Sequence, residues 1–460
     1  MRTPTPSLPI LSLSLILTLA LVGFVFSQEG DQKQKLTTEA KIARDQSLRI
    51  LDEMKEILLE NYFDPKFHGM DINARIETAK TRVKTLEYNW QMYRVLAQVL
   101  MDLDDSHTRV MLPPRNDHFE YGLIWQMIGD QCFVTSVKKD SDAATQGVEV
   151  GDQILAIGKY PPARNNLWKI EYLIYKLDPA NTLDLKIKKP DGAEKTLTIK
   201  AKTSTEKEWA AELKARKDKK DKEKYEPFKC HEINKDLIAC KLDSFVVEKS
   251  DIDKMMKQIA NHPHLILDLR GNPGGFVTME QYLISHFFDH EVKIADLAFK
   301  DKRETRVSKV LDADKQYKGD VIVLVDSDSA SAAEITARVL QIEKRAKVFG
   351  DYSSGHVMTS VSMPFTSIMS ALADAAIIRV GMSVTIADVV MRDGSRLEHT
   401  GIAPDEVLQP VGLALKLKTD VVLAYTAAKF GATLSPEDAG KFYFIAEKDE
   451  DQDSGDGNQK

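Results

Sequence analysis

The chain has 460 residues, 43% of them hydrophobic, which is enough for two or three domains with ordinary cores. Its formal net charge of −7 at pH 7 argues against a nucleic-acid-binding protein, because such proteins carry an excess of basic residues. Its ten histidines and three cysteines form no CxxC or HExxH pair, so the sequence predicts no metal site and no cofactor.

Residues 1–27 are typical of an export signal. Arg2 is the only early charge, and residues 8–26 are almost wholly apolar. Val25 and Ser27 suit the −3 and −1 positions of a cleavage site, and polar residues follow them. An uncleaved anchor helix is the alternative, and it would tether the protein to a membrane. In both cases we expect the rest of the chain to be exported, to a periplasm, a cell envelope or the extracellular space.

Residues 36–114 are predicted to form a helical N-terminal domain. Two segments within it, residues 50–58 and 93–101, repeat apolar side chains at the i, i+3, i+4 spacing of a buried helix face. The helical pattern gives way to a polar turn that contains Ser106 and His107.

From residue 115 to residue 203 the pattern changes to short β-rich runs separated by turns. Residues 147–157, which read GVEVGDQILAI, and the YGLI string that contains Gly122 and Leu123 resemble parts of a PDZ domain. The resemblance implies strand addition of an extended C-terminus, with loop N–H groups at Gly122 and Leu123 capturing its carboxylate. A purely structural β domain is the alternative.

Residues 204–227 are rich in Lys and Glu, and they are predicted to form a solvated helix or linker. Just beyond them, Cys230 and Cys240 flank a turn in a hairpin-like alternating sequence, so their side chains could face each other. Export would permit a disulfide, and two buried thiols are the alternative. Cys132 is left over in either case.

Residues 228–430 alternate buried strands with helices, as expected of an α/β core. Residues 321–325 are a continuous aliphatic strand, and a helix follows from Ala332. The serine-rich turn between them lies at the carboxyl edge of a sheet and at the positive end of a helix, which stabilises a nucleophilic oxygen and an oxyanion. Beyond the core, residues 447–460 are acidic, lack apolar residues and are predicted to be a disordered tail.

A second buried strand, residues 265–269, ends in a glycine-rich turn. Glycines let backbone amides approach a ligand, as an oxyanion hole or a phosphate cradle requires. A nucleotide site is not expected, because neither GxxxxGK[ST] nor GxGxxG is present. A plain tight turn is the other alternative. A serine nucleophile also needs a base, and the candidates are His107 and His356, with Glu398 as a carboxylate that could orient an imidazole.

The segments DLRGNPGG, DSASAAEI and DGSRLEHTGIAPDEV, behind the PDZ-like region, resemble the C-terminal processing and tricorn-core serine peptidases of the S41 grouping. The resemblance covers most of residues 40–430. It implies an α/β fold with a crotonase-like (ClpP/crotonase-type) catalytic core, a helical N-terminal region and an inserted PDZ domain. It matches Ser331 to the nucleophile and matches Ala332, with Gly274 or Gly275, to the oxyanion hole. The implied activity is that of an exported serine endopeptidase that acts on proteins or peptides recruited by their free C-termini.

One position departs from the processing proteases, which carry a general-base lysine in an FGKG-like string after the nucleophile. This chain has His356 there. Tricorn-like members instead use a His from an SH dipeptide before the PDZ domain and a Glu from a late ExxGVxPD string. Ser106-His107 and Glu398 match that pattern, so the resemblance implies His107 as the base, Glu398 as its orienter and Ser106 as a helper.

A Ser331–His356 arrangement is the alternative to a His107 base. The missing lysine also leaves two other classes of function open. One is a catalytically inactive, peptide-binding scaffold, and the other is a carrier of apolar ligands.

Overall fold

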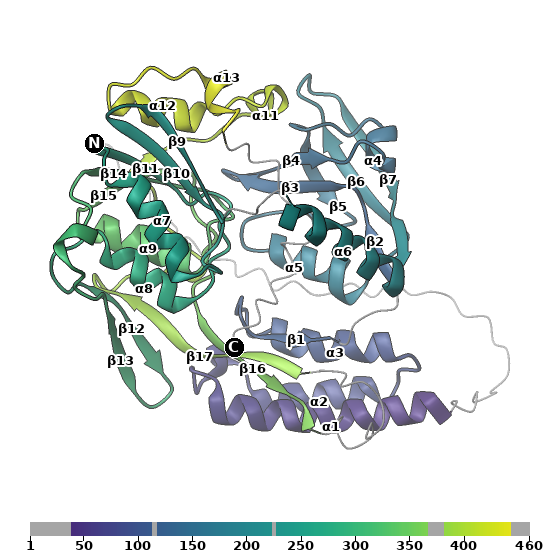
Figure 1. Ribbon diagram of the computed structural model, residues 1–460. Helices are drawn as coiled ribbons and strands as arrows, with labels where there is room; N and C mark the ends of the chain where they lie inside the picture. The colour runs from purple at the N-terminus through teal and green to yellow at the C-terminus, as the bar shows by residue number, and fades with distance from the viewer. Residues whose placement is uncertain (1–37, 113–116, 223–226, 367–380, 443–460) are drawn as a thin grey trace, which may run out of the picture.

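The computed structural model (Figure 1) describes residues 38–112, 117–222, 227–366 and 381–442. The expected export signal of residues 1–27 and the expected tail of residues 447–460 lie outside these ranges. Within the ranges, no helix combines the length and the apolar character needed to cross a bilayer. The chain has a mixed α/β fold with several sheets, as the sequence predicts.

The main core is built on a six-stranded sheet with the order β18-β15-β14-β11-β10-β9. Its strands run parallel except for β9, which is antiparallel to β10. The strands are Phe228–Asn234 (β9), Leu237–Leu242 (β10), His264–Asp268 (β11), Asp320–Val325 (β14), Ala346–Gly350 (β15) and Glu406–Val407 (β18). The central strands are almost continuously apolar because both faces of the sheet are covered.

Helices cover both faces of this sheet. They are α7 (Lys249–Ile259), α8 (Val277–Ser285) and α9 (Ala332–Ile342) on one face, and α12 (Val421–Lys429) and α13 (Pro436–Ala439) on the other. Successive residues of a strand point to opposite faces. Accordingly, Val323 packs against the first set of helices and Leu324 against the second.

A second sheet links this core to the N-terminal helices. Its order is β1-β17-β12-β13, with β16 paired to β17. The strands are Arg109–Met111 (β1), Lys293–Phe299 (β12), Arg303–Val307 (β13), Thr359–Pro364 (β16) and Gly381–Met391 (β17). Near one end of β17, Met382 and Val384 pack among the N-terminal helices, whereas Val389 and Met391 pack in the main core.

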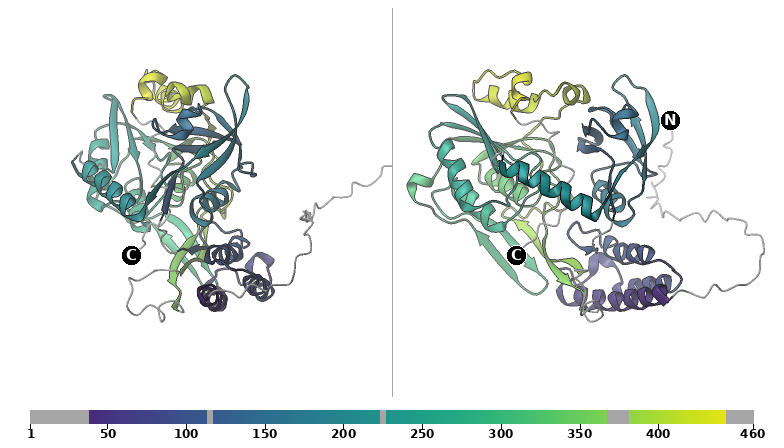
Figure 2. Two further views of the ribbon diagram at one scale, coloured as in Figure 1. Left: turned by 90° about the vertical axis from the view of Figure 1, so that its right-hand side faces the viewer. Right: turned by 45° about the vertical axis from the view of Figure 1, so that its right-hand side comes forward.

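The N-terminal helices are α1 (Thr38–Asn61), α2 (Ile72–Val83) and α3 (Asn89–Met101). In both views of Figure 2 they lie at the opposite end of the molecule from α12 and α13. The turn that follows α3 leads directly into β1, which pairs with β17. Strand β17 therefore fixes where the turn with Ser106 and His107 sits.

The remaining body is a five-stranded antiparallel sheet with the order β3-β4-β5-β6-β7 and a hydrophobic core of its own. Its strands are Leu123–Ile128 (β3), Gln131–Val137 (β4), Gln153–Ile157 (β5), Thr182–Lys188 (β6) and Glu194–Lys200 (β7). Helix α5 (Leu167–Glu171) and the π-helical turn η2 (Tyr172–Leu177) pack on it. Strand β3 is at the edge of the sheet.

Two further expectations can be compared with the structure. The Lys/Glu-rich segment contains a helix, α6 (Glu206–Lys222). Cys230 and Cys240 lie directly opposite each other in the β9–β10 hairpin, and the structure joins them in a disulfide rather than leaving two thiols. Cys132 is a buried free cysteine.

Candidate active site

Ser331 lies at the tip of the sharp turn between β14 and α9, where it caps the N-terminus of the helix. Its φ of 53° and ψ of −118° are unusual for a residue with a side chain, and such strained backbone is concentrated at functional sites. The Ser331 amide donates to the His356 carbonyl at 3.0 Å and to Glu334 Oε2 at 3.1 Å. The backbone of this half-buried serine is therefore held from two directions.

Glu334 joins the Ser331 backbone to the neighbouring segment of residues 353–356. Its fully buried carboxylate also accepts hydrogen bonds from Ser353 Oγ at 2.6 Å and from the amides of Gly355 and His356 at 2.8 and 3.1 Å. Burial raises the pKa of Glu334 to about 7, although these donors oppose the shift. Glu334 is not among the site residues predicted from the sequence. The SxxE spacing of a capping box was the signal that could have revealed its contact with Ser331.

The glycine-rich turn after β11 closes tightly on Ser331. A Cβ on Gly274 would lie 2.7 Å from Ser331 Cβ and 3.0 Å from the Ala332 nitrogen, and its φ is +93°, so only glycine fits. The Gly274 amide donates to Asn272 Oδ1 at 2.8 Å. In the described part of the chain, the amides of Gly275 and Ala332 have no acceptor. Gly275 is thus better suited than Gly274 to donate to an oxyanion.

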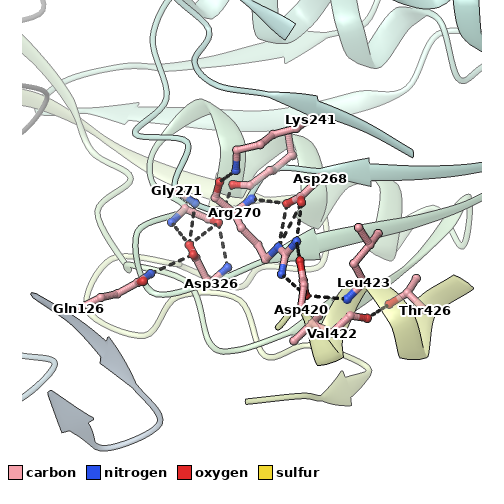
Figure 3. Close-up of polar contacts among 12 residues, drawn as sticks. Gln126, Lys241, Asp268, Arg270, Gly271, Asp326, Asp420, Val422, Leu423 and Thr426 are labelled. Atoms are coloured by element: carbon pink, nitrogen blue, oxygen red, sulfur yellow. Dashed lines mark hydrogen bonds and ion pairs between the residues drawn. The ribbon is translucent and has the colours of Figure 1, made fainter. Parts of the chain in front are cut away.

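Asp326 joins the two turns (Figure 3). Its Oδ1 accepts from the Gly271 amide at 2.8 Å and from the Ser329 amide at 3.1 Å. Its Oδ2 accepts from Gln126 Nε2 of strand β3 at 2.9 Å. One buried carboxylate therefore fixes the glycine-rich turn, the serine turn and the edge of the β3–β7 sheet relative to one another.

Arg270 extends this network into the core (Figure 3). Its Nη2 lies 2.6 Å from Asp268 Oδ2 and 2.7 Å from Asp420 Oδ2, and all three side chains are buried. Burial alone would raise the pKa of Asp268, but the guanidinium charge keeps this pKa below its ordinary value. Asp420 also caps α12 by accepting from the Leu423 amide. The turn that faces Ser331 is thus anchored to a helix on the far face of the sheet.

His107 and Glu398 lie close together, although they are far apart in sequence. His107 Nδ1 is 2.7 Å from Ser106 Oγ, and the Ser106 amide donates to Glu398 Oε1 at 3.2 Å. Glu398 Oε2 accepts from the Val357 amide at 2.9 Å. Burial lowers the pKa of His107, partly opposed by the charges of Glu398 and Asp105. No hydrogen bond joins His107 directly to Ser331 or to Glu398 among the described residues.

The loop that carries His107 is fixed by Asp105. This buried carboxylate accepts from the His107 amide at 2.8 Å and from Thr385 Oγ1 of β17 at 2.9 Å. Ligand-type atoms of Asp105, His107 and Glu398 lie within 4.8 Å of one another, a spacing that could hold a cation. Both carboxylates already accept backbone hydrogen bonds, which suits an orienting network. The absence of a metal therefore stays a prediction.

His356, the alternative base, lies in the segment that runs beside the serine turn. Its Nδ1 lies 2.9 Å from Ser354 Oγ, and its ring meets the edge of the Trp168 ring at 6.2 Å. Burial and the charge of nearby His107 lower the pKa of His356 to about 3. Its imidazole is therefore neutral at pH 7 and is a weak proton acceptor.

Gly122 and Leu123 lie at the start of the edge strand β3. Gly122 has a φ of +73° in a tight contact with Ser141, and Leu123 is buried. Further along β3, the Met127 carbonyl accepts from Ser327 Oγ at 2.6 Å. The β3–β7 body thus touches the serine turn directly.

Residues 238–408 match the family model "Peptidase family S41". A carboxyl-terminal-processing protease of a Picosynechococcus species is 26% identical over 355 residues, which cover 74% of this chain and 78% of that protein. The carboxy-terminal processing protease CtpB of Bacillus subtilis is 23% identical over 71% of this chain and 63% of its own length. Among solved structures, mature CPAF aligns with a TM-score of 0.59 at 15% identity, covering 82% of this chain and 94% of that one. At this identity the structural likeness shows the fold alone.

Proposed function

We propose that this chain, whose residues 238–408 match the model of peptidase family S41, is a serine endopeptidase with Ser331 as its nucleophile. The observation that carries the proposal is the close contact, at Ser331, between the glycine-rich turn after β11 and the serine turn before α9. The serine is held in a strained conformation at a helix N-terminus, and the amides of Gly275 and Ala332 are left without acceptors beside it. Free amides at a helix N-terminus are suited to a developing oxyanion.

In the proposed reaction, Ser331 Oγ attacks a peptide carbonyl while His107 takes its proton. Ser106 Oγ on Nδ1 would hold the ring so that Nε2 faces the reacting atoms. The amides of Gly275 and Ala332 bind the oxyanion. The imidazolium then protonates the leaving amine, and water releases the acyl group from the serine. Glu398 positions Ser106, and its charge stabilises the imidazolium.

The choice of His107 over His356 rests on basicity. A base whose pKa is about 3 accepts a proton poorly at neutral pH. Burial lowers the pKa of His107 as well, but there the nearby carboxylates of Glu398 and Asp105 oppose the shift. The missing lysine is therefore compatible with catalysis.

The pH dependence of kcat/KM offers a check on this base. Burial lowers the pKa of His107, so the imidazole stays neutral and competent at pH values where an ordinary histidine, with a pKa of about 6.5, is already protonated. We expect activity to be lost as pH falls, but only below that ordinary value. Protonation of Glu334, whose pKa is about 7, could also lower activity, so Glu334→Gln is the control. An acidic limb centred above pH 6.5 that persists in both His356→Ala and Glu334→Gln would contradict the assignment.

Gly274→Ala tests the close approach of the two turns. The added methyl group would displace Ser331 and the Ala332 amide, so we expect kcat/KM to fall on the order of 100-fold, comparable to the loss of one oxyanion donor. Gly192→Ala is the matched control, because Gly192 has a φ of +92° but no atom within 4 Å of its Cβ position. Equal losses in the two variants would show that backbone strain alone, and not contact with Ser331, is responsible.

For the rest of the chain, we propose a crotonase-like core over residues 228–430, a helical region over residues 36–114 and a PDZ domain over residues 115–203 that recruits substrate C-termini. The edge position of β3 and the turn at Gly122 support strand addition with carboxylate capture. The export signal and a periplasmic, envelope or extracellular location belong to the same proposal.

A serine-directed fluorophosphonate probe tests the enzyme proposal without knowledge of the substrate. Labelling requires an activated hydroxyl, so we expect wild type to react and Ser331→Ala not to react. If wild type fails to label yet binds peptides with a free C-terminus, the chain is a binding scaffold. Labelling that persists in Ser331→Ala would place the nucleophile elsewhere.

A further inference from the structure

A cavity of about 330 Å³ lies between the β3–β7 body and the main core. The β3–β7 body contributes Asp130, Arg164 and Trp168 to its lining, and the core contributes Tyr352 and His356. This volume is within the range of ligand-binding clefts and exceeds what a single amino-acid side chain needs.

The cavity adjoins the turn that carries the nucleophile. The His356 carbonyl accepts from the Ser331 amide at 3.0 Å, and the amide of Ser354, another lining residue, donates to the Ser329 carbonyl at 2.9 Å. The core wall of the cavity is thus the segment that runs alongside the serine turn. A side chain of a substrate residue near the scissile bond would be within reach of it.

The positive charge in the lining is already neutralised. Arg164 pairs with the buried carboxylate of Asp351 through Nη2 at 2.5 Å. Its Nε donates to the Gly129 carbonyl at 2.8 Å, and its Nη1 donates to the Tyr352 carbonyl at 2.9 Å. All three guanidinium nitrogens of Arg164 are therefore occupied by bonds that join the β3–β7 body to the main core, and they are not available to an anion.

Unlike the guanidinium of Arg164, the carboxylate of Asp130 is unpaired among the described residues. Asp130 is exposed in the short turn between β3 and β4, and it makes no hydrogen bond or ion pair within the part of the chain that the structure describes. Of the two lining histidines, His356 is neutral at pH 7 because burial lowers its pKa to about 3. His399 is the other. Apart from the two histidines, the charged residues of the lining are the paired Arg164 and the unpaired Asp130, so the charge left open to a ligand is negative.

We propose that this cavity is a specificity subsite that accepts a lysine or arginine side chain of the substrate, next to the scissile bond, with Asp130 as its ionic partner. This inference rests on the proposed peptidase function and adds a substrate class to it. The aromatic rings of Trp168 and Tyr352 would lie along the aliphatic stem of such a side chain. Each ring already has a cation of this chain over it, Lys169 on Trp168 and Arg164 on Tyr352, so the rings contribute apolar contact and Asp130 supplies the charge.

The test is the cleavage-site preference of the whole chain on a mixed peptide library, read by mass spectrometry at pH 8, where imidazoles are neutral. We expect Lys and Arg to be enriched roughly tenfold at one position flanking the cleaved bond, as a partly exposed ion pair with aromatic contact would give. Asp130→Asn should remove that enrichment, and Asp130→Lys should favour Asp and Glu there. Asp140→Asn, an exposed aspartate of the same body outside the cavity, should leave the enrichment intact.

A binding measurement keeps this inference separate from the peptidase proposal. Ser331→Ala is titrated with labelled peptides that differ only in carrying Lys, Leu or Glu at the tested position, and fluorescence anisotropy reports their affinities. We expect the Lys peptide to bind roughly tenfold more tightly than the others, and Asp130→Asn to abolish the difference. If the protein cleaves or binds peptides without preferring Lys or Arg at that position, the subsite is wrong and the peptidase proposal stands. Failure of wild type to label or to cleave overturns the enzyme proposal, while the binding series still decides the subsite.

Discussion

Ser331→Ala is expected to reduce peptide hydrolysis on the order of 10⁴-fold or more, because no other described hydroxyl combines the strained turn with the two free amides. The measurement is kcat/KM on a peptide that wild type cleaves. Folding of the variant is checked by its thermal midpoint, which we expect to stay close to that of wild type, since the substitution removes one hydroxyl from a half-buried position.

The same assay separates the two candidate bases. Groups that act as one unit are strongly non-additive, so the true base should reproduce nearly the whole Ser331→Ala loss and add little in the double variant. We expect this of His107→Ala. His356→Ala should cost less, since Ser331 hydrogen-bonds to the His356 backbone, whereas the His356 ring pairs with Ser354 Oγ. The reverse order would assign the base to His356, and peptidase activity retained by Ser331→Ala would remove the proposed mechanism altogether.

Arg270→Leu is expected to lower the free energy of unfolding by about 3–5 kcal/mol, because it would remove the guanidinium that pairs with the buried carboxylates of both Asp268 and Asp420. Urea denaturation followed by circular dichroism measures the change. The expected loss exceeds the sum of the broken hydrogen bonds, since two charges remain in a site that water does not reach.

Arg392→Leu is the matched control for this stability effect. Arg392 also pairs with a carboxylate, that of Glu343, but its side chain is 55% exposed. We expect its removal to cost far less than the loss of Arg270, because water screens an exposed pair. If Arg270→Leu lowered the free energy of unfolding no more than Arg392→Leu, the buried network would contribute no more than a surface ion pair. Arg270 would then not anchor the glycine-rich turn.

Local sequence patterns predicted the main core well. The four central strands of the six-stranded sheet, β10, β11, β14 and β15, are buried on both faces, so their apolar runs are visible in isolation. The strand–turn–helix around Ser331 is equally local. The pairing of Cys230 with Cys240 was left open between a disulfide and two thiols, because a hairpin pattern brings two side chains together without fixing their redox state.

Other parts of the site depend on contacts that no local pattern encodes. The hydrogen bond from Ser106 to Glu398 spans 292 positions. The sequence offered Glu398 as an orienter of an imidazole, and only the family resemblance added Ser106 to the network. Gly274 and Gly275 could not be told apart from the sequence, because the difference depends on the capture of one amide by Asn272. Asp130 and Arg164 escaped attention for the same reason, since their cavity exists only where two bodies meet.

Strand β17 has a consequence for how the molecule comes apart. One end of this strand is packed among α1–α3 and the other within the main core, so neither hydrophobic cluster can lose the strand without exposing part of the other. Contiguous units of this kind open together. The N-terminal helices are therefore not an independent module, and the two regions that supply His107 and Ser331 are expected to form and melt as a single cooperative unit.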